Sequence, residues 1–250
     1  MTPCDPAALA ATPGVQRGAA YAADVLAGRV LAGKKVIAAC RRFEEDWARA
    51  QAGEGPWAFD PALAERPITF MERFLRPSKG AYTAMRLMGW QCFALMNVFG
   101  FISRKTRLRR FRECLIYVGS GNGKSTLMSG LSAFMASKDG ERGADVCLFA
   151  NSRAQAGIIF EECKRQIAGS PELAGRFRVL RDRICYDPAA GQISSYASDS
   201  GKLDGLNPHA AIFDEIHEFG DFRLVDIVKR KFVKRKQPLC WYLTTAGYVN

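Results

Sequence analysis

The sequence predicts an α/β fold in which a parallel β-sheet is flanked by helices and preceded by a helical subdomain. From Arg112 onward, short apolar runs rich in β-forming residues alternate with helical stretches, a pattern typical of a parallel sheet with helices on both faces. These runs are nearly continuous in apolar residues, as strands buried on both faces are. The length of 250 residues and a hydrophobic content of 48% allow one sizeable core.

Two domains are expected: an N-terminal helical region over residues 1–66 and the α/β core over residues 67–250. Residues 1–14 contain three prolines and many alanines, so we expect this terminus to be disordered. The chain reaches its α/β pattern only after the basic stretch that ends at Arg112.

Helical spacing of apolar residues over residues 15–52 predicts two helices, divided by Gly28 and Gly33. A short helix is expected before Pro67 and a second one after it, because proline interrupts the helical hydrogen-bond pattern. A further apolar helix is expected over residues 82–101.

The α/β core is predicted from six apolar or β-prone segments. The two pieces in the middle of the core are expected to be joined by a turn at residues 188–191. The expected strands lie within residues 113–119, 144–151, 176–187, 192–198, 209–215 and 238–247, with helices over residues 127–139 and 152–169.

The strong positive charge indicates a polyanionic partner, either a nucleic acid or an acidic surface. The net charge is +11 and the isoelectric point about 9.4. Two runs, Arg104–Arg112 and Lys229–Lys236, hold six basic residues each. They could be solvated faces or contacts to a phosphate backbone, and no regular pattern of stacking aromatic residues accompanies them.

Several classes of protein are disfavoured. No apolar run reaches the roughly 18 residues that a membrane span needs, and the N-terminus does not have the pattern of a secretory signal. We therefore expect a cytoplasmic protein without a membrane partner. The eight cysteines form no C-x-x-C pair and the only histidines are His209 and His217, so we expect free thiols and no metal site of Cys and His.

A glycine-rich loop between a predicted strand and a predicted helix carries the first chemical signal. Residues 116–126 read IYVGSGNGKST, close to the phosphate-loop (Walker A) pattern G-x-x-x-x-G-K-[ST]. Val118 stands at the first glycine position, and a glycine follows one residue later at Gly119. Backbone N–H groups of such a loop hold phosphate oxygens. The expected nucleotide-binding residues are Gly119, Ser120, Gly121, Asn122, Gly123, Lys124, Ser125 and Thr126.

Within this loop Lys124 would reach the β- and γ-phosphates, and the Ser125 hydroxyl would ligate Mg²⁺. The second signal is Asp214–Glu215 (Walker B), which follows the apolar strand AAIF. Asp214 there can hold Mg²⁺ and Glu215 can polarise the attacking water. Together the two motifs predict an ATP hydrolase with ATP and Mg²⁺ as ligands, on the RecA/ASCE-like fold of the P-loop NTPases.

Two features beside these motifs are less specific. Thr244 and Thr245 end another apolar strand, where their hydroxyls could sense the γ-phosphate or simply close the strand. His217 follows Glu215 by two residues, and we expect it to be a local hydrogen-bond partner or an exposed loop residue rather than a catalytic base.

Taken in order, these segments resemble the ATPase domain of the large terminase subunit of tailed bacteriophages and prophages. The resemblance runs from about Tyr21 to the C-terminus and depends on the ordered series, not on one motif. Its segments are YAADVLAGRVLAGKKVIAACRRFEED, TFMERFLRPSKG, WQCFALMNVFGF, RRFRECLIYVGSGNGKST, SDSGKLDGLNPHAAIFDEIHEF and LTTAG.

The resemblance implies an ATP-driven motor that moves double-stranded DNA into a viral procapsid. It also implies a ring of identical subunits, a small terminase subunit and a portal as partners, and a bacterial cytoplasm as the location. By position, Gln91 would read adenine, Gly121–Thr126 would bind the phosphates, Asp214 would serve Mg²⁺ and Glu215 would be the base. The pair Thr244–Thr245 would couple hydrolysis to motion.

Two departures from the family are visible. Members often carry a basic residue early in the phosphate loop, where Ser120 or Gly121 stands here. Lys202, acting from a neighbouring subunit, is a candidate for the missing cation, and Arg104–Arg112 offers rivals. The family also has a nuclease domain with an RNase H-like carboxylate cluster, whereas this sequence stops at Asn250, so we expect a motor portion alone.

Two other functions stay open from the sequence. Another nucleic-acid-stimulated P-loop ATPase, such as a helicase or translocase, shares the two motifs, although a helicase would need a second RecA-like domain. A nucleotide-binding assembly module without catalysis is disfavoured by the intact Lys124, Asp214 and Glu215.

Overall fold

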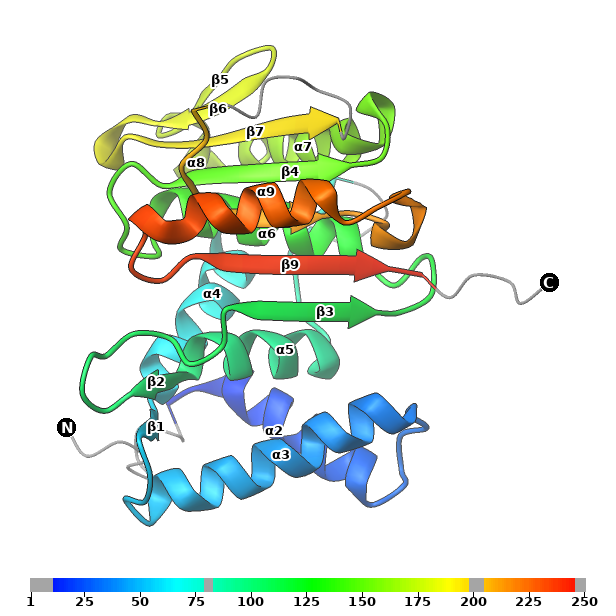
Figure 1. Cartoon of the computed structure of the whole chain (residues 1–250), viewed down its shortest axis with the longest axis vertical. Coiled ribbons are helices and arrows are strands. Elements are labelled where there is room, and N and C mark those ends of the chain that lie inside the picture. Colours follow the sequence, from blue (N-terminus) through cyan, green and yellow to red (C-terminus); the bar gives the residue numbers. More distant parts are fainter. Residues whose placement is uncertain (1–10, 79–82, 198–204, 246–250) are drawn as a thin grey trace. The chain divides into compact units, whose positions relative to one another are not determined.

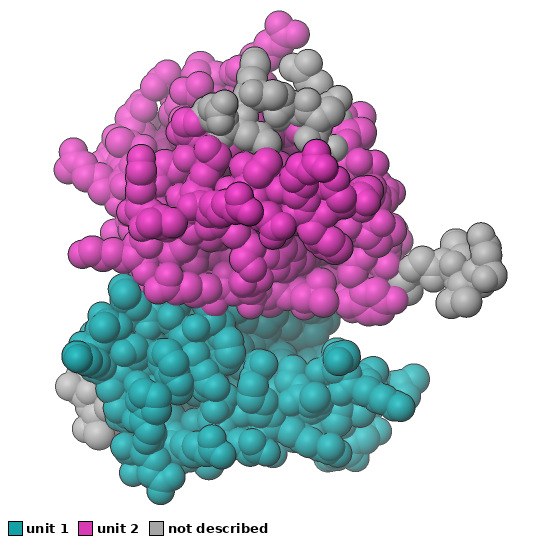
Figure 2. Space-filling view, viewed as in Figure 1, with its two compact units in different colours: residues 1–72, 86–111 teal, residues 73–85, 112–250 magenta. Residues whose placement is uncertain are grey.

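A computed structural model describes residues 11–78, 83–197 and 205–245. The chain forms two compact units, coloured separately in Figure 2. Each unit is assembled from two stretches of sequence: residues 1–72 with 86–111 in unit 1, and residues 73–85 with 112–250 in unit 2. The expected division between residues 66 and 67 stays a prediction.

The first unit is mainly helical. Both helices expected over residues 15–52 are confirmed, and the gap between them holds Gly28, whose φ of 73° suits glycine. The disorder expected through residue 14 is wrong at its end, because Pro13 and Gly14 already belong to the first helix. The elements are α2 (Pro13–Leu26), α3 (Lys34–Gln51), β1 (Trp57–Phe59), α4 (Pro61–Phe74), α5 (Gly89–Gly100) and β2 (Phe101–Ser103).

The predicted break at Pro67 is wrong, since α4 continues through this proline. Pro67 cannot donate a backbone hydrogen bond, which weakens an isolated helix. The helix nevertheless buries Ala64, Ile68 and Met71 completely, and this burial outweighs the local preference. The predicted helix over residues 82–101 begins later than expected, at Gly89.

The core of unit 1 is aromatic. Phe43 packs against Trp47, Phe59, Phe93 and Phe101 with ring centroids 5.4 to 6.4 Å apart. Edge-on and tilted contacts of this kind stabilise a core beyond the area they bury. The aromatic cluster therefore fixes α3 against α5 and the two short strands.

The second unit contains the predicted parallel sheet, which is confirmed (Figure 1). Five neighbouring strands, in the order β3-β9-β8-β4-β7, run parallel, and β6 and β5 extend the sheet antiparallel. The strands are β3 (Glu113–Tyr117), β4 (Asp145–Ala150), β5 (Arg178–Val179), β6 (Arg183–Tyr186), β7 (Gly191–Ala197), β8 (Pro208–Phe213) and β9 (Leu239–Thr244).

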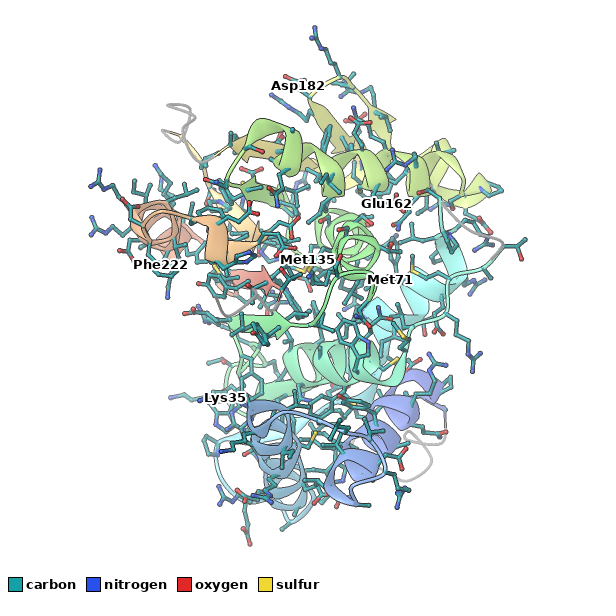
Figure 3. The ribbon with its side chains drawn as sticks, turned by 90° about the vertical axis from the view of Figure 1, so that its right-hand side faces the viewer. Lys35, Met71, Met135, Glu162, Asp182 and Phe222 are labelled. Atoms are coloured by element: carbon teal, nitrogen blue, oxygen red, sulfur yellow. The ribbon has the colours of Figure 1, made fainter. Side chains whose placement is uncertain are left out.

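Helices cover both faces of this sheet, as expected. Figure 3 shows α9, near the labelled Phe222, on the opposite side of the sheet from α6 and α7, near Met135 and Glu162. The helical elements are α6 (Lys124–Ser137), α7 (Arg153–Ala168), α8 (Pro171–Ala174) and α9 (Arg223–Lys231), with short 3₁₀ turns η1 (Asp187–Ala189), η2 (Ile216–Glu218) and η3 (Phe232–Lys234).

Beneath α9, four rings from neighbouring strands form a stacked row. Tyr242, Phe213, Phe149 and Tyr196 follow one another with centroids 5.0 to 5.6 Å apart and planes within 27° of parallel. Leu224, Val225 and Val228 of α9 belong to the same apolar cluster. This packing fixes α9 to the sheet by its apolar side, so its charged side faces away from the core.

Among the described cysteines all are free thiols, and five of them are buried. Burial raises the pKa of Cys163 and Cys147 well above the usual range. Within the described part of the chain, no helix has the length and apolar character to cross a membrane.

Candidate active site

The site is built where three neighbouring strands end. In a parallel sheet the carboxyl ends of all strands lie at one edge, which is where ligands bind in open α/β folds. The strands β3, β9 and β8 are adjacent, and they are followed by the phosphate loop, Thr245 and Asp214 respectively. The strand order therefore brings together motifs that are far apart in the sequence.

The phosphate loop joins β3 to α6 in a shape that two glycines permit. Gly121 and Gly123 have φ values of 78° and 75°, a backbone region that residues other than glycine rarely adopt. The Asn122 amide donates to the carbonyls of Gly119 and Ser120, at 3.1 and 3.3 Å. The loop thus ends at the N-terminus of α6, where free N–H groups favour an anion.

Lys124 is buried in spite of its charge, with 8% of its side chain exposed. Its Nζ donates to the Val118 carbonyl at 3.0 Å and lies 3.5 Å from Glu215 Oε1. The Val118 N–H in turn donates to the Thr244 carbonyl, so the loop is attached to β9. These contacts hold a cation at the mouth of the loop with partners that phosphate oxygens could replace.

Asp214 lies directly at the end of β8 and is 6% exposed. Burial, and next the negative charge of Glu215, raise the pKa of Asp214 to about 6. Its Oδ1 accepts a hydrogen bond from the Glu215 N–H at 3.1 Å. A carboxylate in this position gains from a nearby cation, which would restore its usual acidity.

Glu215 adopts an unusual backbone conformation, with φ 46° and ψ 55°. Left-handed geometry is uncommon for a residue other than glycine, asparagine or aspartate, and it concentrates at functional sites. Its Oε2 accepts two hydrogen bonds from Thr245, from the backbone N–H and from Oγ1, both at 3.1 Å. The turn therefore directs the carboxylate across the end of β9 toward Lys124.

His217 contacts two of the predicted site residues. Its Nδ1 lies 2.9 Å from Thr244 Oγ1 and 3.5 Å from Glu215 Oε2. The expectation of a local hydrogen-bond partner is confirmed, but the sequence did not indicate which residues it would contact. The short turn η2 brings His217 back over the end of β9. This contact depends on the pairing of β8 with β9, which the sequence alone does not reveal.

Two other predicted residues belong to other parts of the chain. Lys202 lies outside the described residues. Gln91 belongs to unit 1, where its Oε1 accepts from the Met88 N–H at 2.8 Å and caps α5. An amide oxygen has two lone pairs and its nitrogen two hydrogens, so this cap leaves bonding capacity for a second partner.

The side chains present fit a nucleotide with Mg²⁺. Mg²⁺ prefers oxygen ligands from one or two carboxylates together with substrate phosphates, and the carboxylate of Asp214 and the hydroxyl of Ser125 are such groups. The buried Lys124 and the helix N-terminus suit phosphate. Glu215, held by Thr245, is the group that could accept a proton from water.

Comparison with known proteins points to one family of ATPase domains. Residues 89–250 match the model of the family "Terminase large subunit, ATPase domain". Protein YmfN of Escherichia coli K12 is 32% identical over 100 residues, covering 40% of this chain and 20% of the relative. The terminase large subunit of Lactococcus phage p2 is 22% identical over 161 residues, covering 62% of this chain and 30% of the relative.

The chain therefore spans less than a third of the length of these curated relatives. Among solved structures, the crystal structure of the HK97 bacteriophage large terminase superposes with a TM-score of 0.64 at 20% identity. It covers 72% of this chain and 37% of the terminase, and the likeness supports the same fold. Because the family model spans more than half of the sequence, the chain belongs to the terminase large subunit ATPase domain family.

Proposed function

We propose that the chain hydrolyses ATP at the carboxyl end of its sheet and uses the energy to move double-stranded DNA into a viral procapsid. The observation that carries this proposal is the placement of Lys124, Glu215 and Thr245. A buried cation lies 3.5 Å from a carboxylate, and that carboxylate is held by two hydrogen bonds from the end of the neighbouring strand.

In this proposal Lys124 exchanges its bond to the Val118 carbonyl for oxygens of the β- and γ-phosphates. Backbone N–H groups of Gly121–Thr126 hold the remaining phosphate oxygens. Ser125 and Asp214 would hold Mg²⁺, which would neutralise charge on the phosphates. Glu215 accepts a proton from the attacking water and Thr245 keeps its carboxylate oriented.

Further roles follow from the family and remain proposals. Gln91 would read the adenine edge with the donor and acceptor positions that its cap leaves open. Thr244 and Thr245 would transmit hydrolysis to movement, and a cation from a neighbouring subunit of a ring, such as Lys202, would complete the site. Duplex DNA, the small terminase subunit and a portal would be the partners, in the cytoplasm of a bacterial host.

Lys124→Ala tests the phosphate site. We expect ATP affinity, measured by calorimetry with Mg²⁺, to fall about 10- to 100-fold, because a charge-assisted bond to phosphate is lost. Lys35→Ala, an exposed lysine of α3, is the matched control and should bind ATP as the unaltered protein does. An unchanged affinity in Lys124→Ala would remove the phosphate loop from the proposal.

A further inference from the structure

The two basic runs have different fates in the structure. In Arg104–Arg112 most cations are already engaged within unit 1. Arg107 pairs with Asp60 at 2.7 Å and Arg110 with Asp46 at 2.8 Å. Arg104 donates to the Ala50 carbonyl, and Arg109 is buried against the Phe99 ring. Most of the positive charges of this run are therefore engaged in contacts within unit 1.

The second run, Lys229–Lys236, keeps most of its charge free. Lys229 pairs with Glu113 at 2.7 Å. Arg235 pairs with Glu141 and donates to the carbonyls of Gly143 and Asn207. Among the described residues no carboxylate lies within ion-pair distance of the other four cations, Arg230, Lys231, Lys234 and Lys236.

A cavity lies beside this run at the amino end of the sheet, and its lining includes Lys229 and Arg235 of the run. The cavity has a volume of about 340 Å³. It lies where α9 ends and where β3 and β9 begin, at the opposite end of the strands from Lys124 and Glu215 (Figure 1). Its lining residues are Arg112, Glu113, Lys229, Phe232, Val233, Arg235 and Pro238.

The same stretch of chain connects this surface to the catalytic residues. After Glu215 the chain turns through η2, crosses the sheet as α9, passes η3 and returns as β9 to Thr244 and Thr245. The apolar side of α9 is packed on the sheet, so the helix can transmit displacement as a unit. A force applied to the basic end of α9 would therefore act on the segment between Glu215 and Thr244–Thr245.

We propose that the basic end of α9 with η3 binds the phosphate backbone of duplex DNA, and that this contact stimulates ATP hydrolysis at the other end of the sheet. The inference rests on the proposed function for the choice of duplex. The charge of this surface supports a polyanion independently of that function, because four of its clustered cations have no carboxylate within ion-pair distance among the described residues. The apolar side chain of Val233 is 87% exposed and would suit a protein partner better than DNA. An acidic protein segment is therefore the alternative ligand of this surface, and the experiment below distinguishes it from duplex DNA.

The test removes three charges from exposed or half-exposed positions. The triple variant Arg230→Gln, Lys231→Gln, Lys234→Gln is compared with a control of equal charge, Lys34→Gln, Lys35→Gln, Lys105→Gln, whose lysines are exposed in unit 1. Duplex binding is followed by fluorescence anisotropy over a range of salt concentrations. ATPase activity is measured with and without the duplex, and thermal unfolding checks that both variants are folded.

We expect the α9–η3 variant to bind duplex at least about tenfold more weakly, with a salt slope reduced by about 2 to 3. Its ATPase rate without DNA should be unchanged and the stimulation by DNA lost, while the control keeps both. Unaltered duplex affinity and stimulation in the α9–η3 variant would overturn the inference. Binding of a polyglutamate peptide but not of duplex to the unaltered protein, lost in the variant, would also overturn it in favour of an acidic protein partner.

Failure of the proposed function is distinguishable from these results. If the unaltered protein hydrolyses no ATP under any condition, the motor proposal fails, while duplex affinity and salt slope still decide whether the basic surface binds DNA. If DNA stimulates the variant as strongly as the unaltered protein, the motor stands and the surface is wrong.

Discussion

Two lysine–glutamate pairs of unit 2 lie at opposite ends of its sheet, and the closer of these two pairs is the less consequential. Lys229 and Glu113 approach to 2.7 Å, but 42% and 51% of their side chains are exposed. Lys124 and Glu215 are 3.5 Å apart, with 8% and 18% exposed. Exposed pairs contribute only about 0–1 kcal/mol, whereas buried charges interact strongly with whatever replaces their partner. Distance alone therefore does not rank ion pairs.

The environments of the two glutamates differ accordingly. Partial burial alone would raise the pKa of Glu113, but hydrogen bonds from Lys229 and Tyr242 hold this pKa below its usual value. Glu113 is thus satisfied as a surface anion. Glu215 is held by Thr245 and faces Lys124 without a close bond to it.

Glu215→Gln should break this contrast most severely. The amide keeps the shape of the side chain but cannot accept a proton, so turnover should fall about 10²- to 10⁴-fold while ATP binding persists. Steady-state ATPase assays and calorimetry measure the two quantities. Glu113→Gln makes the same chemical change at the other end of the sheet and should keep full turnover. Full activity in Glu215→Gln would mean that another group is the base.

Asp214→Asn should stabilise the nucleotide-free protein while abolishing Mg²⁺-dependent turnover. The pKa of Asp214 is raised from 3.8 to about 6, so the folded state binds a proton more tightly than the unfolded state. Between about pH 4 and 6 this group therefore makes stability fall as the pH rises, and the loss is complete above pH 6. Removing the charge should recover up to about 3 kcal/mol at neutral pH.

Urea unfolding at pH 5 and pH 7.5 without Mg²⁺ measures this effect. The gain from Asp214→Asn should be larger at pH 7.5 than at pH 5. Glu218→Gln, three residues after Glu215 and exposed, is the control and should change little. If Asp214→Asn were less stable than the unaltered protein at pH 7.5, burial of the charged Asp214 carboxylate would not be destabilising the folded state.

His217→Ala should reduce kcat about five- to tenfold without changing the KM for ATP. The loss corresponds to about one hydrogen bond that orients the catalytic residues, here the contact to Thr244 beside Glu215. His217→Asn can place an amide group near the position of Nδ1 and should restore part of the rate. A parallel change in KM, or no rescue by asparagine, would argue against orientation as the role of this side chain.

Glu113→Gln should have the smallest effect on stability. It tests the exposed member of the two lysine–glutamate pairs compared above. Losing an exposed pair should change the free energy of unfolding by less than about 1 kcal/mol. It also removes the negative charge that lines the basic cavity, so duplex affinity should rise severalfold at low salt. Anisotropy titrations with Glu161→Gln, which removes an exposed glutamate paired with Lys164 and absent from the cavity lining, would check that the gain depends on position.

The parts of the site that depend on local sequence could be predicted. Gly121, Gly123 and Lys124 define the loop by their own conformational and chemical preferences, and Asp214–Glu215 follows a strand that its apolar residues mark. The bonds from Thr245 to Glu215 could not be predicted, because they depend on β9 lying between β3 and β8. The left-handed turn at Glu215 also has no signature in the side chain itself.

The two basic runs show the same limit for charge. Each has six cations, and composition does not distinguish them. Arg107 and Arg110 are neutralised by Asp60 and Asp46, which are about 50 residues or more away in the chain and come close only through tertiary structure. The helix break predicted at Pro67 was wrong for a related reason. Burial of α4 overrides the tendency of proline to end a helix, which holds for an isolated helix.

The stacked row of Tyr242, Phe213, Phe149 and Tyr196 limits how this unit can deform. Sliding one of these strands by a residue would move its ring to the opposite face and break that ring's stacking contacts with its neighbours. The four strands are therefore expected to behave mechanically as a stiff plate, with little elastic energy stored between them. Work released at one edge of such a plate can leave it only through hinges at its border, in the turns on either side of α9.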